Sequence, residues 1–174
     1  MKTFTNADIR SWKPCYDPSL KNRIETKQHT IVSVLENKSL HLNDRIWVIM
    51  RRQLVSDEFM RIFATKCARL SIDNNTDPRL VRAIEIAEGV GADVLNKSEL
   101  VRARNILRTM PWSPSREIIE CALEPKEASA ARLVVRALTS PRYHDFLATP
   151  DSSIEKILMQ MIILKNSEIG QRYE

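Results

Sequence analysis

The stretch DRIWVIMRRQLVSDEFMRIFATKCARLSIDNNTDPRLVRAIEIAE, from Asp44 to Glu88, contains three consecutive helix signals with little sequence between them. Its apolar residues recur at spacings of three and four, which places them on one face of a helix. Ser56 is followed by two acidic residues, and Asp77 is followed by a proline, and both patterns are typical of helix starts. We therefore expect the rest of the chain to be organised around these helices.

The composition favours an all-α fold. The 174 residues include only three glycines, whereas β-rich folds use many of them in tight turns. Helical spacing and capping signals continue on both sides of the central stretch, and eight prolines lie mostly where helices begin or end. These patterns predict a single domain over residues 1–174, a compact bundle of eight or nine short helices, after an irregular segment at 1–25. A short solenoid of helix pairs is the alternative, which the lack of a repeat of fixed period disfavours.

The helices that the pattern predicts can be given by residue range. They cover 26–37, 44–53, a third helix capped by Ser56, 78–88 ending at Gly89, 97–108, a short helix after Pro114, one from about 125 to 138, 143–147 and 154–165. The last of these, from Ile154 to Lys165, is apolar around most of its circumference. Such a helix is either enclosed by the bundle or forms a homodimer interface, and we favour enclosure slightly.

The net charge of +5 is concentrated near the N-terminus, where residues 1–55 carry ten Lys/Arg against five Asp/Glu. A basic protein favours acidic partners, including nucleic acid, although many proteins of this charge bind none. No signal peptide and no apolar run of membrane-spanning length is present, so we expect no membrane association. Three cysteines without a CxxC pair, Cys15, Cys67 and Cys121, indicate a reducing cytoplasm.

A search for reactive groups yields no catalytic, cofactor-binding or metal-ligating set. His29, His41 and His144 are the only histidines, and none has a second ligand at metal-binding spacing on a shared helix face. Phosphate-binding, dinucleotide-binding and zinc-protease motifs are absent from the sequence. We therefore predict that the protein is not an enzyme and needs no cofactor.

Two pairs of arginines stand out, Arg104 with Arg108 and Arg132 with Arg136. Each pair places like charges one helical turn apart, which costs a few tenths of a kcal/mol in an isolated helix. An anion or an acidic partner facing them would explain the pattern. The alternative is that neighbouring helices supply the carboxylates, for which four glutamates are close in sequence: Glu117, Glu120, Glu124 and Glu127.

Other basic and aromatic residues complete the set of candidates for binding a partner or an anion. Arg51 and Arg52 lie within the central stretch, and Trp112 lies in a loop between two prolines, where it is a lid on the core or an exposed anchor. Arg61 and Arg69 flank the apolar stripe of the third helix, which suggests buried ion pairs with a neighbouring helix. The candidates are thus Arg51, Arg52, Arg104, Arg108, Trp112, Arg132 and Arg136.

Three segments of the chain resemble a group of uncharacterised helical proteins from bacteriophage and bacterial genomes, some of which are labelled as immunity proteins. The segments are ADIRSWKPCYDP (residues 7–18), DRIWVIMRRQLVSDEFMRIFATKCAR (44–69) and DPRLVRAIEIAE (77–88). They match a Trp-Val turn, an R-x-F-A-x-x-C-A-R helix and a D-P-R-x-x-x-A-x-x-x-A-E helix of that group. The resemblance covers roughly residues 1–100 and ends before the Ala/Arg-rich repeats of many members. It implies a helical domain of phage or mobile-element origin and implies no activity.

Two functional hypotheses follow. The first is a non-enzymatic interaction protein, encoded by a phage, that binds and modulates a host or phage macromolecule; an inhibitor of a bacterial defence system would fit. The second is a basic helical domain that binds nucleic acid through residues 1–55 and the Arg104–Arg108 face. No helix-turn-helix pair is clear enough to name a recognition helix.

Overall fold

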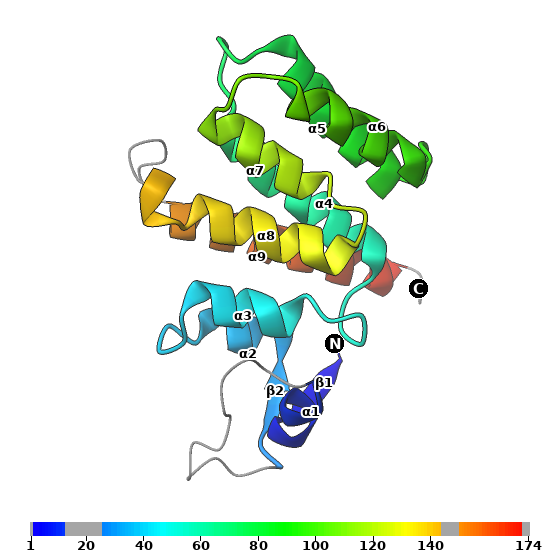
Figure 1. Ribbon diagram of the computed structural model, residues 1–174. Helices are drawn as coiled ribbons and strands as arrows, with labels where there is room; N and C mark the ends of the chain where they lie inside the picture. Colours follow the sequence, from blue (N-terminus) through cyan, green and yellow to red (C-terminus); the bar gives the residue numbers. More distant parts are fainter. Residues whose placement is uncertain (1, 13–25, 144–149, 172–174) are drawn as a thin grey trace.

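The computed structural model of the chain describes residues 2–12, 26–143 and 150–171. Within these ranges it contains nine α-helices, two single-turn 3-10 helices and one pair of short strands (Figure 1), so the all-α fold class is confirmed. In chain order the elements are β1 (Thr3–Thr5), α1 (Asn6–Ser11), β2 (Gln28–Thr30), α2 (Ile31–Glu36), α3 (Leu42–Ile49), α4 (Asp57–Ala68), η1 (Arg69–Ser71), α5 (Pro78–Gly91), α6 (Lys97–Arg108), α7 (Pro114–Ala122), α8 (Glu127–Leu138), η2 (Pro141–Tyr143) and α9 (Pro150–Gln171).

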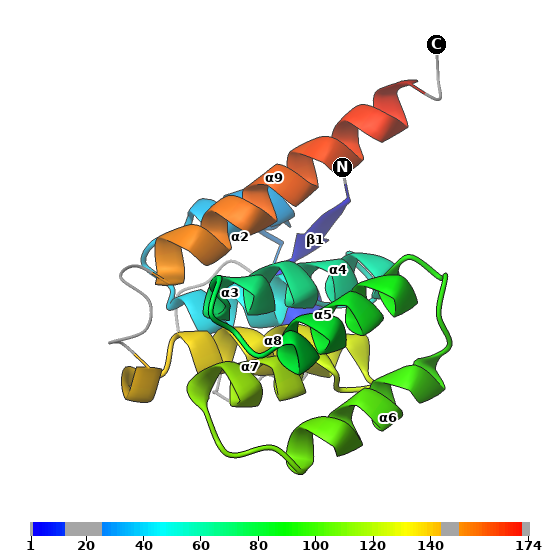
Figure 2. The same ribbon diagram turned by 90° about the horizontal axis from the view of Figure 1, so that it is seen from above.

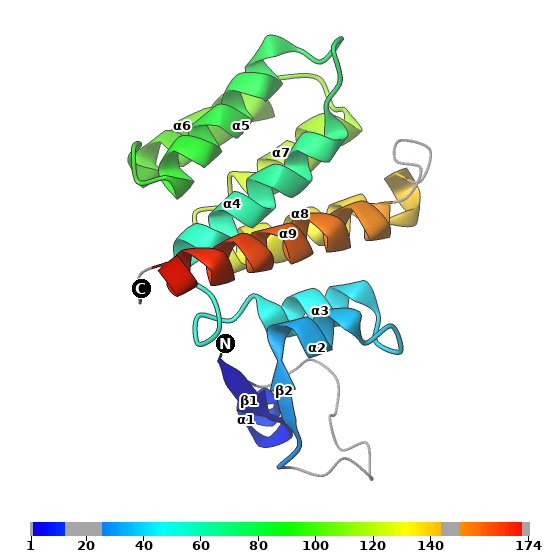
Figure 3. The same cartoon turned by 180° about the vertical axis from the view of Figure 1, so that it is seen from behind.

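The helices are stacked in layers, with α4 in the middle. Figures 1 and 3 show the order α5 and α6, then α4 and α7, then α8 and α9, then α2 and α3, with α1 and the strands at the far end. Helix α4 packs against α5, α7, α8 and α9, and one cluster of buried apolar side chains extends from Phe4 to Ile162. Because α4 pairs most extensively with α8, from which three intervening helices separate it in the chain, the arrangement is not a solenoid of consecutive helix pairs.

The N-terminal segment contains more regular structure than the sequence predicts. Strand β1 pairs with β2 in antiparallel fashion, with Phe4 opposite His29, and Thr5 begins α1 through a capping box with Asp8. The prediction of an irregular segment is therefore wrong for residues 3–11, while residues 13–25, including Cys15, lie outside the described ranges. Strand β2 also delays the next helix, which begins at Ile31 after the cap Thr30 and not at residue 26.

Most helix starts follow the local capping signals. Ser56, Asp77, Asn96 and Ser113 each accept a hydrogen bond from a backbone N–H in the first turn of the helix that follows. These starts are confirmed. Helix α3 begins at Leu42, two residues before the predicted start at residue 44, because the side chain of His41 accepts the capping hydrogen bond. The predicted helix at 143–147 falls almost wholly outside the described residues.

The end of α5 differs from the prediction. The helix does not stop at Gly89 but continues through Gly91, and the left-handed residue that ends it is Asp93, with φ of 57°. Gly91 is needed for packing: a Cβ atom there would lie 2.9 Å from Cγ of the buried Arg61. Glycine thus allows α5 to approach the arginine stem on α4.

Helix α9 lies on the surface of the bundle, against α2 and α4. Four of its apolar side chains are buried: Ile154, Leu158, Met161 and Ile162. Glu155 accepts a hydrogen bond from Lys38 and forms an ion pair with Arg45. Ile163 and Leu164 are 58% and 62% exposed, and the C-terminal part of the helix extends past the other helices (Figure 2). The expected enclosure is therefore wrong for this part, and α4 is the enclosed helix. A homodimer through α9 stays a prediction.

Candidate binding cleft between α3 and α8

Helices α3 and α8 pack side by side and leave a cleft of about 500 Å³ between them. Volumes of this size are typical of sites that hold a small ligand or a few side chains of a partner. Its lining comes from both helices: Asn43, Asp44, Ile46 and Trp47 of α3, and Ser129, Arg132, Leu133 and Arg136 of α8. The cleft therefore combines charged groups of both signs with apolar side chains.

The sequence of α8 explains why its lining residues share one face. Ala130, Ala131, Val134, Val135 and Leu138 are fully buried and fix the face that packs on the core. Positions 129, 132, 133 and 136 follow the spacing of three and four that defines a second helical face. Arg132 and Arg136, one of the two arginine pairs identified in the sequence, therefore both line the cleft.

The guanidinium groups of this pair have few partners inside the protein. Arg132 donates from Nε to the carbonyl oxygen of Ala128 in its own helix, at 2.9 Å. Among the described residues, no carboxylate lies within 4.0 Å of Arg132 or of Arg136. Asp44 lines the opposite wall without reaching either of them. Two positive charges one turn apart therefore remain available at the cleft.

Arg51 and Arg52 lie close to the cleft in sequence but do not line it. The Arg51 guanidinium lies 3.5 Å from the ring centroid of Trp47 and 6.0 Å from that of Trp12, a cation–π arrangement that fixes the tryptophan wall. Arg52 points elsewhere and pairs with Asp57 at 2.9 Å on the surface. Arg51 thus supports the cleft indirectly, whereas Arg52 belongs to a surface ion pair.

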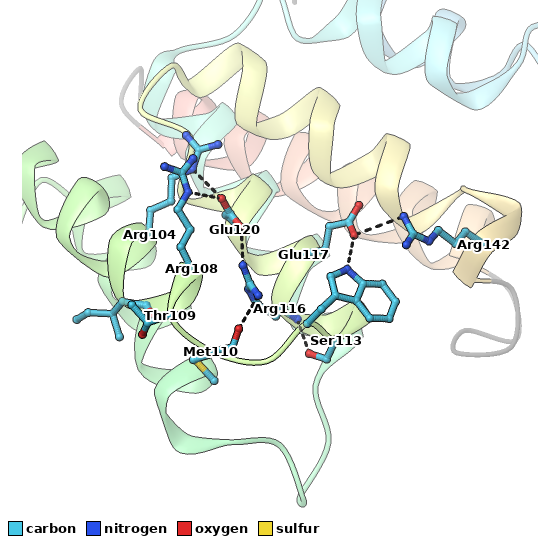
Figure 4. A network of polar contacts seen from close by, with 11 residues as sticks. Arg104, Arg108, Thr109, Met110, Ser113, Arg116, Glu117, Glu120 and Arg142 are labelled. Carbon is cyan, nitrogen blue, oxygen red and sulfur yellow. Dashed lines mark hydrogen bonds and ion pairs between the residues drawn. The ribbon is translucent and has the colours of Figure 1, made fainter.

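The other arginine pair faces Glu120 of α7, as Figure 4 shows, and Arg104 also reaches Glu124 in the turn that follows α7. Glu120 Oε1 accepts from Nε of Arg104 at 3.3 Å and from Nε of Arg108 at 2.9 Å. Arg104 Nη1 also donates to Glu124 at 2.9 Å, and Arg116 lies 3.8 Å from the second oxygen of Glu120. For Arg104 and Arg108, neighbouring helices therefore do supply the carboxylates, and this pair holds α6 against α7.

Trp112 lies at the edge of the same network and away from the cleft. Its Nε1 donates to Glu117 Oε2 at 2.9 Å, and the Arg142 guanidinium lies 4.9 Å from the ring centroid. The side chain is nevertheless 54% exposed. It is a fixed aromatic platform on the surface, not a lid on the core.

A buried arginine joins α4 to the turn between α7 and α8. Arg61 is 1% exposed and donates from Nη1 to the carbonyl oxygen of Ala122 at 2.6 Å and from Nη2 to that of Pro125 at 3.1 Å. Its Nη2 lies 3.8 Å from Glu127, which also pairs with Lys97 at 2.5 Å. Burial lowers the pKa of Arg61, although the Glu127 charge opposes this. The expected buried ion pair of Arg61 is confirmed, whereas Arg69 pairs with Glu88 on the surface.

The cysteines do not offer a reactive thiolate in the described part of the chain. Burial raises the pKa of Cys67, and burial together with Glu117 and Glu120 raises the pKa of Cys121 to about 11. Both thiols are therefore protonated at neutral pH. Within the described ranges, which leave out Cys15 and His144, no group of three or more His, Cys, Asp or Glu residues is placed to hold a metal ion.

The sequence pointed to the arginines of the cleft but missed its opposite wall. Asp44 and Trp47 carry no special signal, because an acidic residue in a first turn and an apolar residue on a helix stripe are common. Comparison of the chain with protein-family models, with curated proteins and with solved structures finds no match to any of them. Of the helices in the described ranges, none is long and apolar enough to cross a membrane.

Proposed function

We propose that the protein is a non-enzymatic interaction protein that binds a partner protein through the cleft between α3 and α8. One contrast carries the proposal. Arg104 and Arg108 face Glu120 and Glu124, whereas Arg132 and Arg136 repeat the same sequence pattern without a carboxylate in reach among the described residues. A stabilising ion-pair role explains the first pair and leaves the second pair to be explained by binding.

The energetics of the cleft favour binding of a carboxylate. Two like charges one turn apart repel each other weakly, and a carboxylate placed between them converts that repulsion into charge-assisted hydrogen bonds. Trp47 and Leu133 add apolar surface next to the arginines, and Leu133 is 38% exposed. Arginine and tryptophan are the residue types that dominate the binding energy of protein interfaces.

The biological setting of the proposal comes from the resemblance of residues 1–100. A helical protein of phage origin that acts in the cytoplasm of a bacterial host would bind and modulate a macromolecule of that host or of the phage. Inhibition of a bacterial defence system is one such role. The basic net charge of +5 favours an acidic partner surface.

Nucleic acid is the second candidate partner, and the charge of residues 1–55 favours it. Two features of the site weigh against it. Arg104 and Arg108, the arginines first considered for phosphate contacts, are neutralised by α7, and Asp44 places a negative charge inside the cleft. That carboxylate repels the sugar–phosphate backbone of a nucleic acid and does not contribute to its binding.

The proposal can be tested with a photo-crosslinking amino acid placed in the cleft. Benzoylphenylalanine replaces Leu133 in the full chain, which is expressed in bacterial cells, irradiated and purified with and without nuclease. We expect a protein adduct that survives nuclease and that is lost when Arg132→Gln and Arg136→Gln are added. A matched charge control, Arg82→Gln with Arg102→Gln on the exposed faces of α5 and α6, keeps the adduct.

A second crosslinker position controls for chance contacts. Val94 is 77% exposed and lies beyond the end of α5, outside the cleft. The same adduct from position 94, or no adduct from position 133 at all, would refute the cleft as the binding site. An adduct that disappears with nuclease would favour the nucleic-acid alternative.

A further inference from the structure

Resting on the proposed function, we infer that the cleft binds an extended or helical segment of the partner that carries two acidic residues, one apolar residue and one basic residue. The lining provides a complementary group for each of these. Arg132 and Arg136 line the α8 side, Asp44 lines the α3 side, and both helices contribute apolar side chains. The volume of about 500 Å³ admits side chains of a segment and not a folded domain.

The α8 wall sets the spacing of the two acidic residues. Arg132 and Arg136 are one helical turn apart on the same face, so their Cβ atoms lie about 5–6 Å apart. Carboxylates of a ligand match this spacing at positions i and i+4 of a helix or at alternate positions of an extended strand. The planar guanidinium group binds a carboxylate through two parallel hydrogen bonds, which favours Asp and Glu over neutral polar residues.

The α3 wall distinguishes a peptide from a nucleic acid. Asp44 is half-buried in the first turn of α3, where the helix dipole stabilises its negative charge, and the side chain lines the cleft. A peptide can place a lysine or arginine opposite this carboxylate while its acidic residues face α8. A nucleic acid carries no positive charge to place there, and its phosphates are repelled by the carboxylate.

The apolar part of the cleft accounts for the remaining residue of the segment. Ile46, Trp47 and Leu133 all line the cleft, and of these Ile46 is 1% exposed and Leu133 is 38% exposed. The guanidinium of Arg51 covers the Trp47 ring and so limits its motion. An apolar side chain from the partner would be removed from water there, which adds affinity without adding charge.

Selection from a library of random dodecapeptides displayed on phage tests this inference directly. The folded wild-type protein is the bait, and the Arg132→Gln/Arg136→Gln variant removes peptides that do not need the arginines. We expect enriched peptides to carry paired Asp or Glu residues, an apolar residue and a Lys or Arg. Synthetic versions should bind the variant at least about tenfold more weakly, which is the effect of losing charge-assisted hydrogen bonds. The control Arg82→Gln/Arg102→Gln should bind unchanged.

The variant Asp44→Asn separates the two classes of partner. It should weaken the selected peptides about two- to fivefold, as expected for one ion pair that water still reaches. It should tighten any binding of a fluorescent DNA duplex, because it removes a negative charge. A duplex that binds the wild type more tightly than the selected peptides, and loses that binding in the arginine variant, would overturn the inference. Failed enrichment, or enriched peptides without acidic residues, would also overturn it.

Failure of this inference can be told apart from failure of the proposed function. The partner peptide crosslinked to position 133 can be sequenced by mass spectrometry. A cleft-dependent protein adduct with no acidic residues in the attached peptide leaves the proposed function intact and refutes the acidic segment. Absence of any cleft-dependent adduct refutes the proposed function itself.

Discussion

Replacing Arg61 with methionine should destabilise the protein by about 2–4 kcal/mol. The substitution keeps most of the apolar stem on α4 and removes the donors to the carbonyl oxygens of Ala122 and Pro125. Ala122 is the last residue of α7, and its carbonyl has no partner within that helix. Each hydrogen bond from a charged donor contributes about 1.5–3 kcal/mol. The variant loses two such bonds, but it no longer pays the desolvation cost of a buried guanidinium, which offsets part of the loss.

The loss of stability in Arg61→Met should come from the two carbonyl groups that lose their donor and not from an unpaired carboxylate of Glu127. Glu127 keeps Lys97 as its partner at 2.5 Å when Arg61 is removed. For a chain of this size, a loss of 3 kcal/mol corresponds to a fall in Tm of about 6–12 °C. Urea unfolding followed by far-UV circular dichroism gives the free energy of unfolding, and a thermal scan of the same samples gives Tm.

The matched control is Arg102→Met, because Arg102 is exposed and pairs only with Glu99 of its own helix among the described residues. That change should stay within about 0.5 kcal/mol of the wild type. An Arg61→Met variant as stable as the control would refute the role of Arg61 at the turn between α7 and α8. Arg61→Lys should fall between the two, because one ammonium group cannot replace a planar fork that reaches two carbonyls.

Three further outcomes are expected. Gly91→Ala should destabilise the protein by about 1–2 kcal/mol, although alanine is the better helix former, because the new Cβ would lie 2.9 Å from the buried Arg61 stem. Gly89→Ala should be tolerated, because its Cβ meets only the flexible, partly exposed side chain of Leu95. Urea unfolding of the two variants compares the free energies of unfolding. Burial raises the pKa of Glu127, but the hydrogen bond and charge of Lys97 outweigh this effect and lower its folded-state pKa below 4.5. The ionised Glu127 therefore stabilises the fold above its unfolded-state pKa, and this stabilisation is lost as pH falls through the folded-state pKa. Glu127→Gln should flatten that part of a stability–pH profile, and an unchanged profile would contradict the assignment. Ile162→Asp should cost several kcal/mol and unfold the chain, because it buries an unpaired charge, whereas Ile163→Asp, at a 58% exposed position, should leave the chain folded. If sedimentation instead shows a folded, monomeric Ile162→Asp variant and a dimeric parent, Ile162 lies in a homodimer interface.

Helix starts could be predicted from the sequence because capping is a local interaction. Ser56, Asp77 and Ser113 each bond a backbone N–H two or three residues ahead, and nothing distant is needed to recognise them. The end of α5 could not be predicted in the same way. Gly91 lies inside the helix and against an arginine stem on α4, where a Cβ atom would not fit, and the pairing of those two helices is a tertiary contact.

The candidate site shows the same limit more sharply. The pairs at 104/108 and at 132/136 have the same spacing and the same charge, and the sequence offers nearby glutamates to both. Only the three-dimensional positions of Glu120 and Glu124 show that the first pair is satisfied internally. Asp44 and Trp47 enter the site because α3 faces α8, which is a tertiary contact that the sequence pattern does not reveal.

The position of α4 also bears on the order in which the chain can fold. Its largest contact is with α8, which is synthesised only after α5, α6 and α7 have followed it. Helices of a simple bundle close on their sequence neighbours, and such short-range contacts make folding fast. Here the helix on which the core depends keeps an apolar face uncovered until α8 has left the ribosome. The hairpin of α5 and α6 can close early, whereas the core around α4 must wait for a long loop to close.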